Sequence, residues 1–212
     1  MDKQVGVIGL GAMGGGMARS LRRAGHGVHV FDLRADAAQA FAAEGGTAHT
    51  SAAELAAQCD VVVSVVVNAA QTEELLFGAG GVAQAMRQGS VFVMCSTVDP
   101  GWSAALETRL AERGLLYLDA PISGGAAKAA AGQITMMTAG RPEAYEQCGA
   151  LLDAMAAKVY RLGDRAGAGS KVKVINQLLA GVHIAAAAEA MALGLREGVD
   201  AAALYEVITH SA

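Results

Sequence analysis

The sequence predicts an α/β protein, in which a Rossmann-type, doubly wound and mostly parallel sheet is followed by the start of an all-α C-terminal domain. Three observations predict this fold. A glycine-rich turn at residues 9–14 joins a strand-like run to a helical pattern. Apolar, strand-like runs then alternate with helical patterns as far as residue 162. No strand-like run follows Gly163, and a long apolar helix is expected there instead.

The first predicted strand, residues 5–8, leads directly into the glycine turn. Gly9 permits the tight turn, Gly11 lets the backbone approach a pyrophosphate, and Gly14 lets helix and strand pack closely. The helix that follows has apolar residues at 13, 17 and 21 and stops at residues 24–27. Its N–H groups and positive dipole end favour an anion. The turn therefore predicts a dinucleotide site at Gly9, Leu10, Gly11, Ala12, Met13 and Gly14, with an ordinary strand–turn–helix as the alternative.

The second predicted strand, residues 28–31, ends at Asp32, and Leu33 follows it. A carboxylate at this position accepts hydrogen bonds from the adenosine ribose and repels a 2′-phosphate, so Asp32 favours NAD over NADP. Arg34 is the competing signal, because an arginine here could hold a 2′-phosphate unless it turns to solvent. We expect NAD as the cofactor, with Asp32 and Leu33 at its ribose.

Further strands are expected at residues 61–67, 91–95, 115–118, 134–138 and 159–162. The run at 61–67 is almost entirely valine, which is typical of a central parallel strand covered on both faces. Val67 and Asn68 at its tip are expected to line the adenosine side of the ligand crevice. Among the intervening helices, Ser51 and Glu54 have capping-box spacing, and Asp99 before Pro100 is an N-cap signal.

The C-terminal part begins with a glycine-rich joint at residues 163–169. One helix is predicted from about residue 170 to about residue 196, stopping near Gly198, and Asp200 caps another. We place the domain boundary between residues 1–165 and 166–212. Polar residues interrupt the apolar run of 178–195, which indicates a buried helix and not a membrane span. A helix so apolar needs neighbours, and we expect a further segment or a partner chain to supply them, the latter as a homo-dimer or tetramer through the helical domain.

Composition excludes several classes of protein. A chain of 212 residues with 53% apolar and 17% charged residues can bury a substantial core and is not disordered. The net charge of −4 and the absence of a basic run argue against nucleic acid and acidic membrane surfaces as partners. The three cysteines are widely spaced, which favours a reduced, cytoplasmic setting over disulfides or a metal site. The N-terminus lacks a convincing signal-peptide cleavage site.

Three clusters of polar residues fall where the crevice is expected. Ser96 and Thr97 follow the strand at 91–95, and Ser123, Gly124 and Gly125 follow the strand at 115–118. A hydroxyl beside bare backbone amides suits a substrate carboxylate, although a plain turn before a helix is an equally good interpretation.

The third cluster opens the long helix. Lys173 shares a helix face with Asn176 and Gln177, whereas Lys171 points the opposite way, towards solvent. A lysine desolvated in a cleft has a lowered pKa and can take a proton from a hydroxyl group, although most lysines at helix starts are solvated surface charges. His183 either reaches the substrate or is a satisfied buried histidine, which we favour. Cys95 is interpreted as a small core residue, since no base lies beside it.

Three stretches together resemble the β-hydroxyacid dehydrogenase family, which includes 3-hydroxyisobutyrate dehydrogenase, tartronate semialdehyde reductase and 6-phosphogluconate dehydrogenase. They are the glycine turn with Met17 and Ala18, the segment 119–125 and the segment 167–177. The likeness covers the whole chain. It implies that Lys173 is the catalytic lysine, that Ser123, Gly124 and Gly125 hold the substrate, and that Thr97 touches the nicotinamide side. Gln177 stands where some members have a second asparagine.

Residues 176–191 and 209–212 resemble more closely a bacterial subgroup that oxidises four-carbon sugar acids. The resemblance therefore implies NAD-dependent oxidation of a small hydroxy acid, with Lys173 as general base and Asn176 and Gln177 at the substrate. It also implies a longer helical domain than this chain holds. The rival interpretation is a dinucleotide-binding module without catalysis, in which the lysine and the serine–glycine loop would have no role.

Overall fold

The computed structural model describes residues 3–211 and divides the chain into two compact units. The first ends at Lys173 and the second begins at Val174. The division falls within a single helix, Ala168–Arg196. The domain boundary between residues 165 and 166 stays a prediction.

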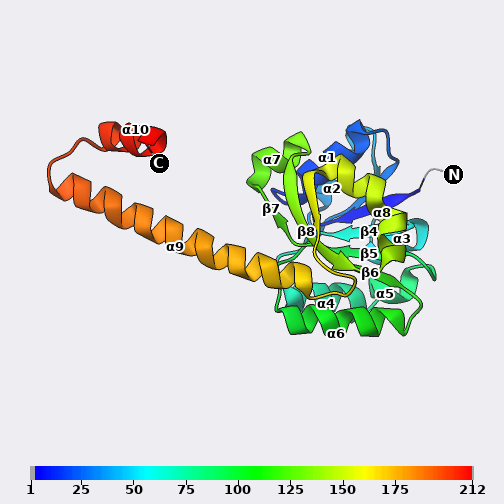
Figure 1. Cartoon of the computed structure of the whole chain (residues 1–212). Coiled ribbons are helices and arrows are strands. Elements are labelled where there is room, and N and C mark those ends of the chain that lie inside the picture. The colour runs from blue at the N-terminus through cyan, green and yellow to red at the C-terminus, as the bar shows by residue number, and fades with distance from the viewer. Residues whose placement is uncertain (1–2, 212) are drawn as a thin grey trace. The chain divides into compact units, whose positions relative to one another are not determined.

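The first unit is built on one sheet, to which nine strands of the described chain contribute (Figure 1). Their order is β3-β2-β1-β4-β5-β6-β8-β7, and β9 also pairs with β8. The strands from β3 to β6 are all parallel, and β8 runs antiparallel to β6 and β7. The strands are β1 (Val5–Ile8), β2 (Val28–Phe31), β3 (Thr47–Ala48), β4 (Val61–Ser64), β5 (Val91–Met94), β6 (Leu116–Asp119), β7 (Ile122–Ser123), β8 (Ile134–Gly140) and β9 (Ala156–Arg161).

The chain order reverses at β1, which lies between β2 and β4. Val5 is in register with Val28 of β2 and with Val61 of β4. In an open parallel sheet, the carboxyl ends of the strands diverge at such a reversal and leave a crevice for a ligand. The sheet therefore positions a binding site beyond Ile8, Phe31 and Ser64.

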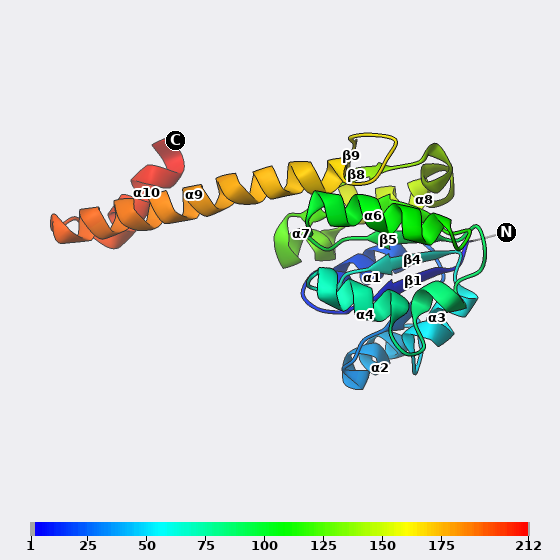
Figure 2. The ribbon, with the colours of Figure 1, turned by 90° about the horizontal axis from the view of Figure 1, so that it is seen from below.

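Helices cover both faces of the sheet (Figures 1 and 2). Apolar residues of α1, α2, α7 and α8 form one core with Val61 and Val63, and residues of α3, α4, α5 and α6 form a second core with Val62. This alternation along β4 explains why its sequence is a continuous apolar run. The helices are α1 (Gly14–Arg23), α2 (Ala35–Ala43), α3 (Ala52–Gln58), α4 (Ala69–Phe77), α5 (Val82–Ala85), α6 (Pro100–Ala111), α7 (Gly125–Ala131) and α8 (Pro142–Met155).

The predicted fold class is confirmed, with small corrections to the strands. β1 and β2 have the expected bounds, whereas β4 ends at Ser64 and not at residue 67. β9 begins at Ala156, three residues before the expected start. β3 and β7 were not predicted, because a strand of two residues carries no alternation signal.

The predicted helix caps are confirmed with one change. Asp99 Oδ1 accepts a hydrogen bond from the Trp102 N–H at 2.9 Å. Ser51 Oγ accepts one from the Glu54 N–H at 3.1 Å, as a capping box requires. The Glu54 carboxylate, however, accepts from the N–H and hydroxyl of Thr50 at 3.0 and 2.8 Å.

The second unit contains most of α9 (Ala168–Arg196) and all of α10 (Ala201–Ser211). The predicted end of α9 is confirmed: Gly198 has φ 80°, and the Val199 N–H donates to the Gly194 carbonyl group at 2.9 Å. The predicted cap of α10 is also present, since Asp200 Oδ1 accepts from the Ala203 N–H at 3.0 Å.

The prediction that α9 is buried is wrong for the described structure. Its buried residues are Gly169, Ser170 and Lys173, while Leu178 and Ile184 are 68% and 72% exposed. His183 is exposed as well, so it is not the buried histidine that we favoured. Residues 3–211 do not supply the neighbours that an apolar helix needs. By length and composition alone α9 could span a membrane, which for a single helix is weak evidence.

Candidate active site

The glycine turn adopts the geometry that a close phosphate approach requires. Gly9 has φ 92°, and a Cβ atom there would meet the Val65 carbonyl oxygen at 2.8 Å. A Cβ atom on Gly14 would overlap the Gly9 carbonyl oxygen, so helix α1 packs directly on the turn. At Gly11, by contrast, a Cβ atom would enter open space. Among the described residues, no side chain caps α1, so the N–H groups at its positive end stay available to an anion.

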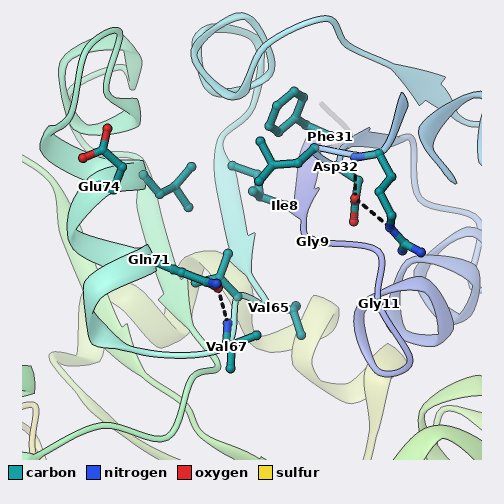
Figure 3. Close-up of a pocket in the computed structure, with 13 residues that line it drawn as sticks. Ile8, Gly9, Gly11, Phe31, Asp32, Val65, Val67, Gln71 and Glu74 are labelled. Atoms are coloured by element: carbon teal, nitrogen blue, oxygen red, sulfur yellow. Dashed lines mark hydrogen bonds and ion pairs between the residues drawn. The ribbon is translucent and has the colours of Figure 1, made fainter. Parts of the chain in front are cut away.

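A cavity of about 560 Å³ opens beyond the carboxyl ends of β1, β2 and β4 (Figure 3). Five of the predicted cofactor residues line it: Gly9, Gly11, Asp32, Leu33 and Val67. Its position at the reversal of strand order is where doubly wound sheets bind nucleotides. The cavity, the bare turn and the helix end together fit a dinucleotide.

Asp32 holds the turn and the β2 end together. Its carboxylate accepts hydrogen bonds from the Leu10 N–H at 2.6 Å and from the Arg34 N–H at 2.8 Å. Burial raises the pKa of Asp32, but these hydrogen bonds and the Arg34 charge outweigh burial and hold the pKa below its usual range. Asp32 is therefore ionised at neutral pH. The Arg34 guanidinium lies 3.4 Å from Asp32 and its side chain is 63% exposed.

The opposite wall of the cavity contains residues that the sequence did not single out (Figure 3). Gln71 and Glu74 of α4 line it together with Val65 and Val66. Gln71 Oε1 accepts a hydrogen bond from the Val67 N–H at 2.9 Å and so fixes the loop after β4. Gln71 and Glu74 lie in the first and second turns of α4, and their spacing matches no binding motif that could have revealed them in the sequence.

Asn68 has a structural partner of its own. Its Oδ1 atom caps α4 by accepting a hydrogen bond from the Gln71 N–H at 2.9 Å. The cavity lining includes Val67 but not Asn68. A contact between Asn68 and the cofactor therefore stays a prediction.

Two loops beyond β5 and β7 carry the predicted nicotinamide and substrate residues. Ser96 Oγ donates to the Val66 carbonyl group at 2.7 Å, while Thr97 is exposed. Ser123 ends β7, and Gly124 and Gly125 have φ values of 137° and 77°, which side chains rarely adopt. The serine–glycine loop thus exposes backbone amides at the start of α7, with the half-buried Ser123 beside them.

The start of α9 is held by a buried carboxylate. Asp119, the last residue of β6, accepts hydrogen bonds from the Gly167 N–H at 2.9 Å, the Ser170 N–H at 2.9 Å and the Ser170 hydroxyl at 2.6 Å. Burial raises the pKa of Asp119, and the hydrogen bonds from Ser170 and Gly167 offset only part of this rise. One feature of the sequence points to this role, an acidic residue at the end of a buried strand.

The two lysines of α9 differ as predicted. Lys173 is only 6% exposed, whereas Lys171 is exposed. Burial lowers the pKa of the Lys173 amine from its ordinary value of 10.5. A lowered pKa increases the share of neutral amine, which is the form that can accept a proton. Asn176 and Gln177 follow in the same helix and belong to the second unit.

The three cysteines are not candidate nucleophiles. Cys59, Cys95 and Cys148 are buried free thiols, and burial raises the pKa of each to about 12. They are protonated at neutral pH, and Cys95 is a core residue as interpreted. Within residues 3–211, no group of three or more His, Cys, Asp or Glu side chains could hold a metal ion.

Comparison with known proteins gives two family matches. Residues 4–163 match the NAD-binding domain of 6-phosphogluconate dehydrogenase, and residues 167–212 match the NAD-binding domain of NADP-dependent 3-hydroxyisobutyrate dehydrogenase. An L-threonate dehydrogenase of Cupriavidus necator is 64% identical over 212 residues, which are 100% of this chain and 71% of that protein. One from Escherichia coli K12 is 46% identical over 98% of this chain and 69% of its own length.

Solved structures agree with the sequence matches. A crystal structure of 3-hydroxyisobutyrate dehydrogenase from Salmonella typhimurium superposes with a TM-score of 0.95 at 48% identity, covering 100% of this chain and 74% of that one. The family matches cover both units, and the first alone covers more than half of the chain. The chain therefore belongs to the 3-hydroxyisobutyrate dehydrogenase-like family of NAD-dependent hydroxyacid dehydrogenases.

Proposed function

We propose that this protein oxidises L-threonate, or a closely related four-carbon aldonate, to the 2-oxo acid with NAD as the hydride acceptor. The observation that carries the proposal is the 64% identity, along the whole chain, to the Cupriavidus necator L-threonate dehydrogenase. The cavity at the reversal of strand order and the buried Lys173 amine support it from the structure.

In this proposal the first unit binds and orients NAD. Backbone amides of the turn hold the pyrophosphate, Asp32 accepts hydrogen bonds from the ribose, and Leu33 and Val67 line the adenosine side. The remaining proposed contacts come from Leu10, Ala12, Met13, Gly14, Asn68 and Thr97. When bound, NAD supplies the carbon that accepts the hydride.

The proton is the protein's part of the reaction. The neutral Lys173 amine takes the proton from the substrate hydroxyl oxygen as the hydride leaves the carbon that bears this hydroxyl group. Ser123, Gly124 and Gly125 are proposed to bind the substrate carboxylate through a hydroxyl and backbone amides. Asn176 and Gln177, which follow Lys173 in α9, are proposed to contact the substrate.

A substrate panel tests this function. Full-length protein and NAD are mixed with L-threonate, D-erythronate, 3-hydroxyisobutyrate and L-serine, and tartronate semialdehyde is tested with NADH. We expect NADH absorbance to rise fastest with L-threonate, and the product to be the 2-oxo acid by mass spectrometry. Higher kcat/KM for 3-hydroxyisobutyrate, or for tartronate semialdehyde reduction, would replace the proposed substrate. NAD binding without turnover of any acid would indicate a non-catalytic module.

Cofactor choice is a separate prediction. We expect kcat/KM to be at least about tenfold higher with NAD than with NADP, because an ionised Asp32 repels the 2′-phosphate. In Asp32→Ser the repulsion is gone and the exposed Arg34 can pair with the phosphate, so the preference should shrink or reverse. Steady-state kinetics with both cofactors checks this. A wild-type preference for NADP would contradict the role assigned to Asp32.

Oligomeric state and location follow from the same proposal. We infer a cytoplasmic enzyme whose partner, apart from its hydroxy acid substrate, is a second copy of the chain. The exposed apolar residues of α9, including Leu178, Val182 and Ile184, support a homo-dimer or tetramer through the helical unit. We expect no nucleic acid or membrane partner. A monomer in multi-angle light scattering would contradict the oligomer.

A further inference from the structure

The buried carboxylate of Asp119 is attached to a backbone position that is held by strands on both sides. Its backbone is in register with Met94 of β5 on one side and with Ala139 of β8 on the other. Asp119 is fully buried, so its side chain cannot move without disturbing the centre of the sheet. A group fixed in this way can serve as a reference point for a neighbouring loop or helix.

Asp119 accepts hydrogen bonds from the start of α9 as well as from Ser103 of α6. Three donors converge on it from Gly167 and Ser170, which lie 48 and 51 residues further along the chain. It therefore caps α9 from outside the helix, in place of a local N-cap side chain. A Cβ atom on Gly169 would clash with the Met137 carbonyl oxygen and lie 3.1 Å from that of Asp119, so the first turn is seated directly on the sheet.

The position of Lys173 depends on this first turn. Lys173 is three residues after Ser170, so the two side chains lie on the same face of α9. Both are buried, at 6% and 0% exposure, whereas Lys171 and Val172 between them are exposed. A shift of the first turn would carry the Lys173 amine out of its buried position.

We infer that Asp119 is a positioning residue for the reaction. By capping the first turn of α9, Asp119 fixes the position of the buried Lys173 amine. The inference deepens the proposed function and rests on it for the role of Lys173. Burial lowers the pKa of Lys173. Asp119 acts on this pKa through the helix, because it holds the turn that keeps Lys173 buried. The other polar groups that face Asp119 include Tyr117, Ser103 and Cys95.

Three variants of the full chain separate capping from general stability. Asp119→Ala removes the acceptor. Asp119→Asn keeps it, because the amide oxygen can accept both backbone N–H groups and the amide NH₂ can donate to the Ser170 hydroxyl. Leu110→Ala truncates a fully buried side chain of α6, near the start of β6 and so at the opposite end of that strand from Asp119, and is the control for lost stability.

The primary readouts do not need a substrate. Amide hydrogen exchange of residues 167–173 is followed by mass spectrometry, and Lys173 acetylation by an amine-reactive ester is measured relative to Lys171. In Asp119→Ala we expect exchange and relative acetylation to rise about tenfold or more, the size of a lost N-cap. Asp119→Asn should stay within about threefold of wild type, and Leu110→Ala should lower the Tm without changing either readout.

Ser170→Ala serves where Asp119→Ala fails to fold. It removes one of the three hydrogen bonds, and a smaller rise of about threefold in both readouts is expected. Wild-type amide exchange and wild-type Lys173 acetylation in the folded Asp119→Ala or Ser170→Ala variant would overturn the inference. So would an Asp119→Asn variant that behaves like Asp119→Ala.

With L-threonate as substrate, Asp119→Ala should lose kcat about tenfold while the KM for NAD stays within twofold. A wild type that does not oxidise L-threonate would refute the proposed function and leave the exchange and acetylation results valid.

Discussion

Lys173→Ala is expected to lower kcat for L-threonate oxidation by roughly 10²–10⁴-fold, the usual contribution of a general base. The dissociation constant for NAD should change by less than about twofold, because the cavity is lined by residues of β1, β2 and α4 and of the loops after β1, β2 and β4, and not by α9. The two effects separate a residue that acts on the hydroxyl proton from one that holds the cofactor.

The measurement is kcat at saturating NAD and L-threonate, with NAD affinity from isothermal titration calorimetry. Lys171→Ala is the matched control, since Lys171 lies two residues away in the same helix and is exposed. It should keep wild-type kcat. Wild-type turnover in Lys173→Ala, or an equal loss in both variants, would remove Lys173 from the mechanism.

Gly11→Val is expected to weaken NAD binding by about a hundredfold or more while leaving the Tm of the ligand-free protein within a few degrees of wild type. The reason is geometric. The Cβ atom of the added side chain would meet no protein atom within 4 Å apart from its chain neighbours, so the fold should tolerate the substitution. It would project into the space beside the turn where the pyrophosphate must approach the backbone amides.

Gly149→Val is the matched control for this substitution. Gly149 lies in α8, and a Cβ atom there also meets nothing within 4 Å, but it is remote from the cavity lining. Its NAD affinity should equal that of wild type. Calorimetry with both variants, and thermal unfolding without NAD, give the comparison. Normal NAD affinity in Gly11→Val would mean that the pyrophosphate does not lie against this turn.

The parts of the fold that could be predicted are those with local signals. The glycine turn, the runs at β1 and β2 and the caps at Ser51, Asp99 and Asp200 each depend on residues a few positions apart. The structure confirms these elements and caps, because local interactions determine them. The short strands β3 and β7 depend on pairing with neighbours distant in sequence, so a local pattern could not reveal them.

The site divides in the same way. Gly9, Gly11 and Asp32 belong to one strand–turn–helix–strand unit, and all three line the cavity. The capping role of Asp119 joins residues about fifty positions apart. Gln71 reaches the cavity because α4, through Leu76, shares a core with strands β1 and β4. Such partners follow from the sheet order and not from any spacing in the sequence.

The wrong predictions concern burial in α9. His183 and the apolar residues around it have the composition of a core helix, but composition does not specify which surface covers it. Burial depends on neighbours, and residues 3–211 leave this part of α9 exposed. Lys173 is buried because it belongs to the start of α9, which Asp119 of the sheet holds through Gly167 and Ser170 within the first unit. Its catalytic role stays a prediction.

The central claim, that a buried neutral amine at Lys173 accepts the substrate proton, is tested most directly by the pKa of that amine. Protein labelled with ¹³C-lysine is titrated by NMR, and the Lys173 signal is assigned by its loss in Lys173→Arg. We predict a midpoint below the ordinary 10.5 that coincides with the ascending limb of kcat/KM for L-threonate oxidation against pH. A midpoint at or above 10.5, or an ascending limb that Lys173→Arg leaves unchanged, would contradict the claim.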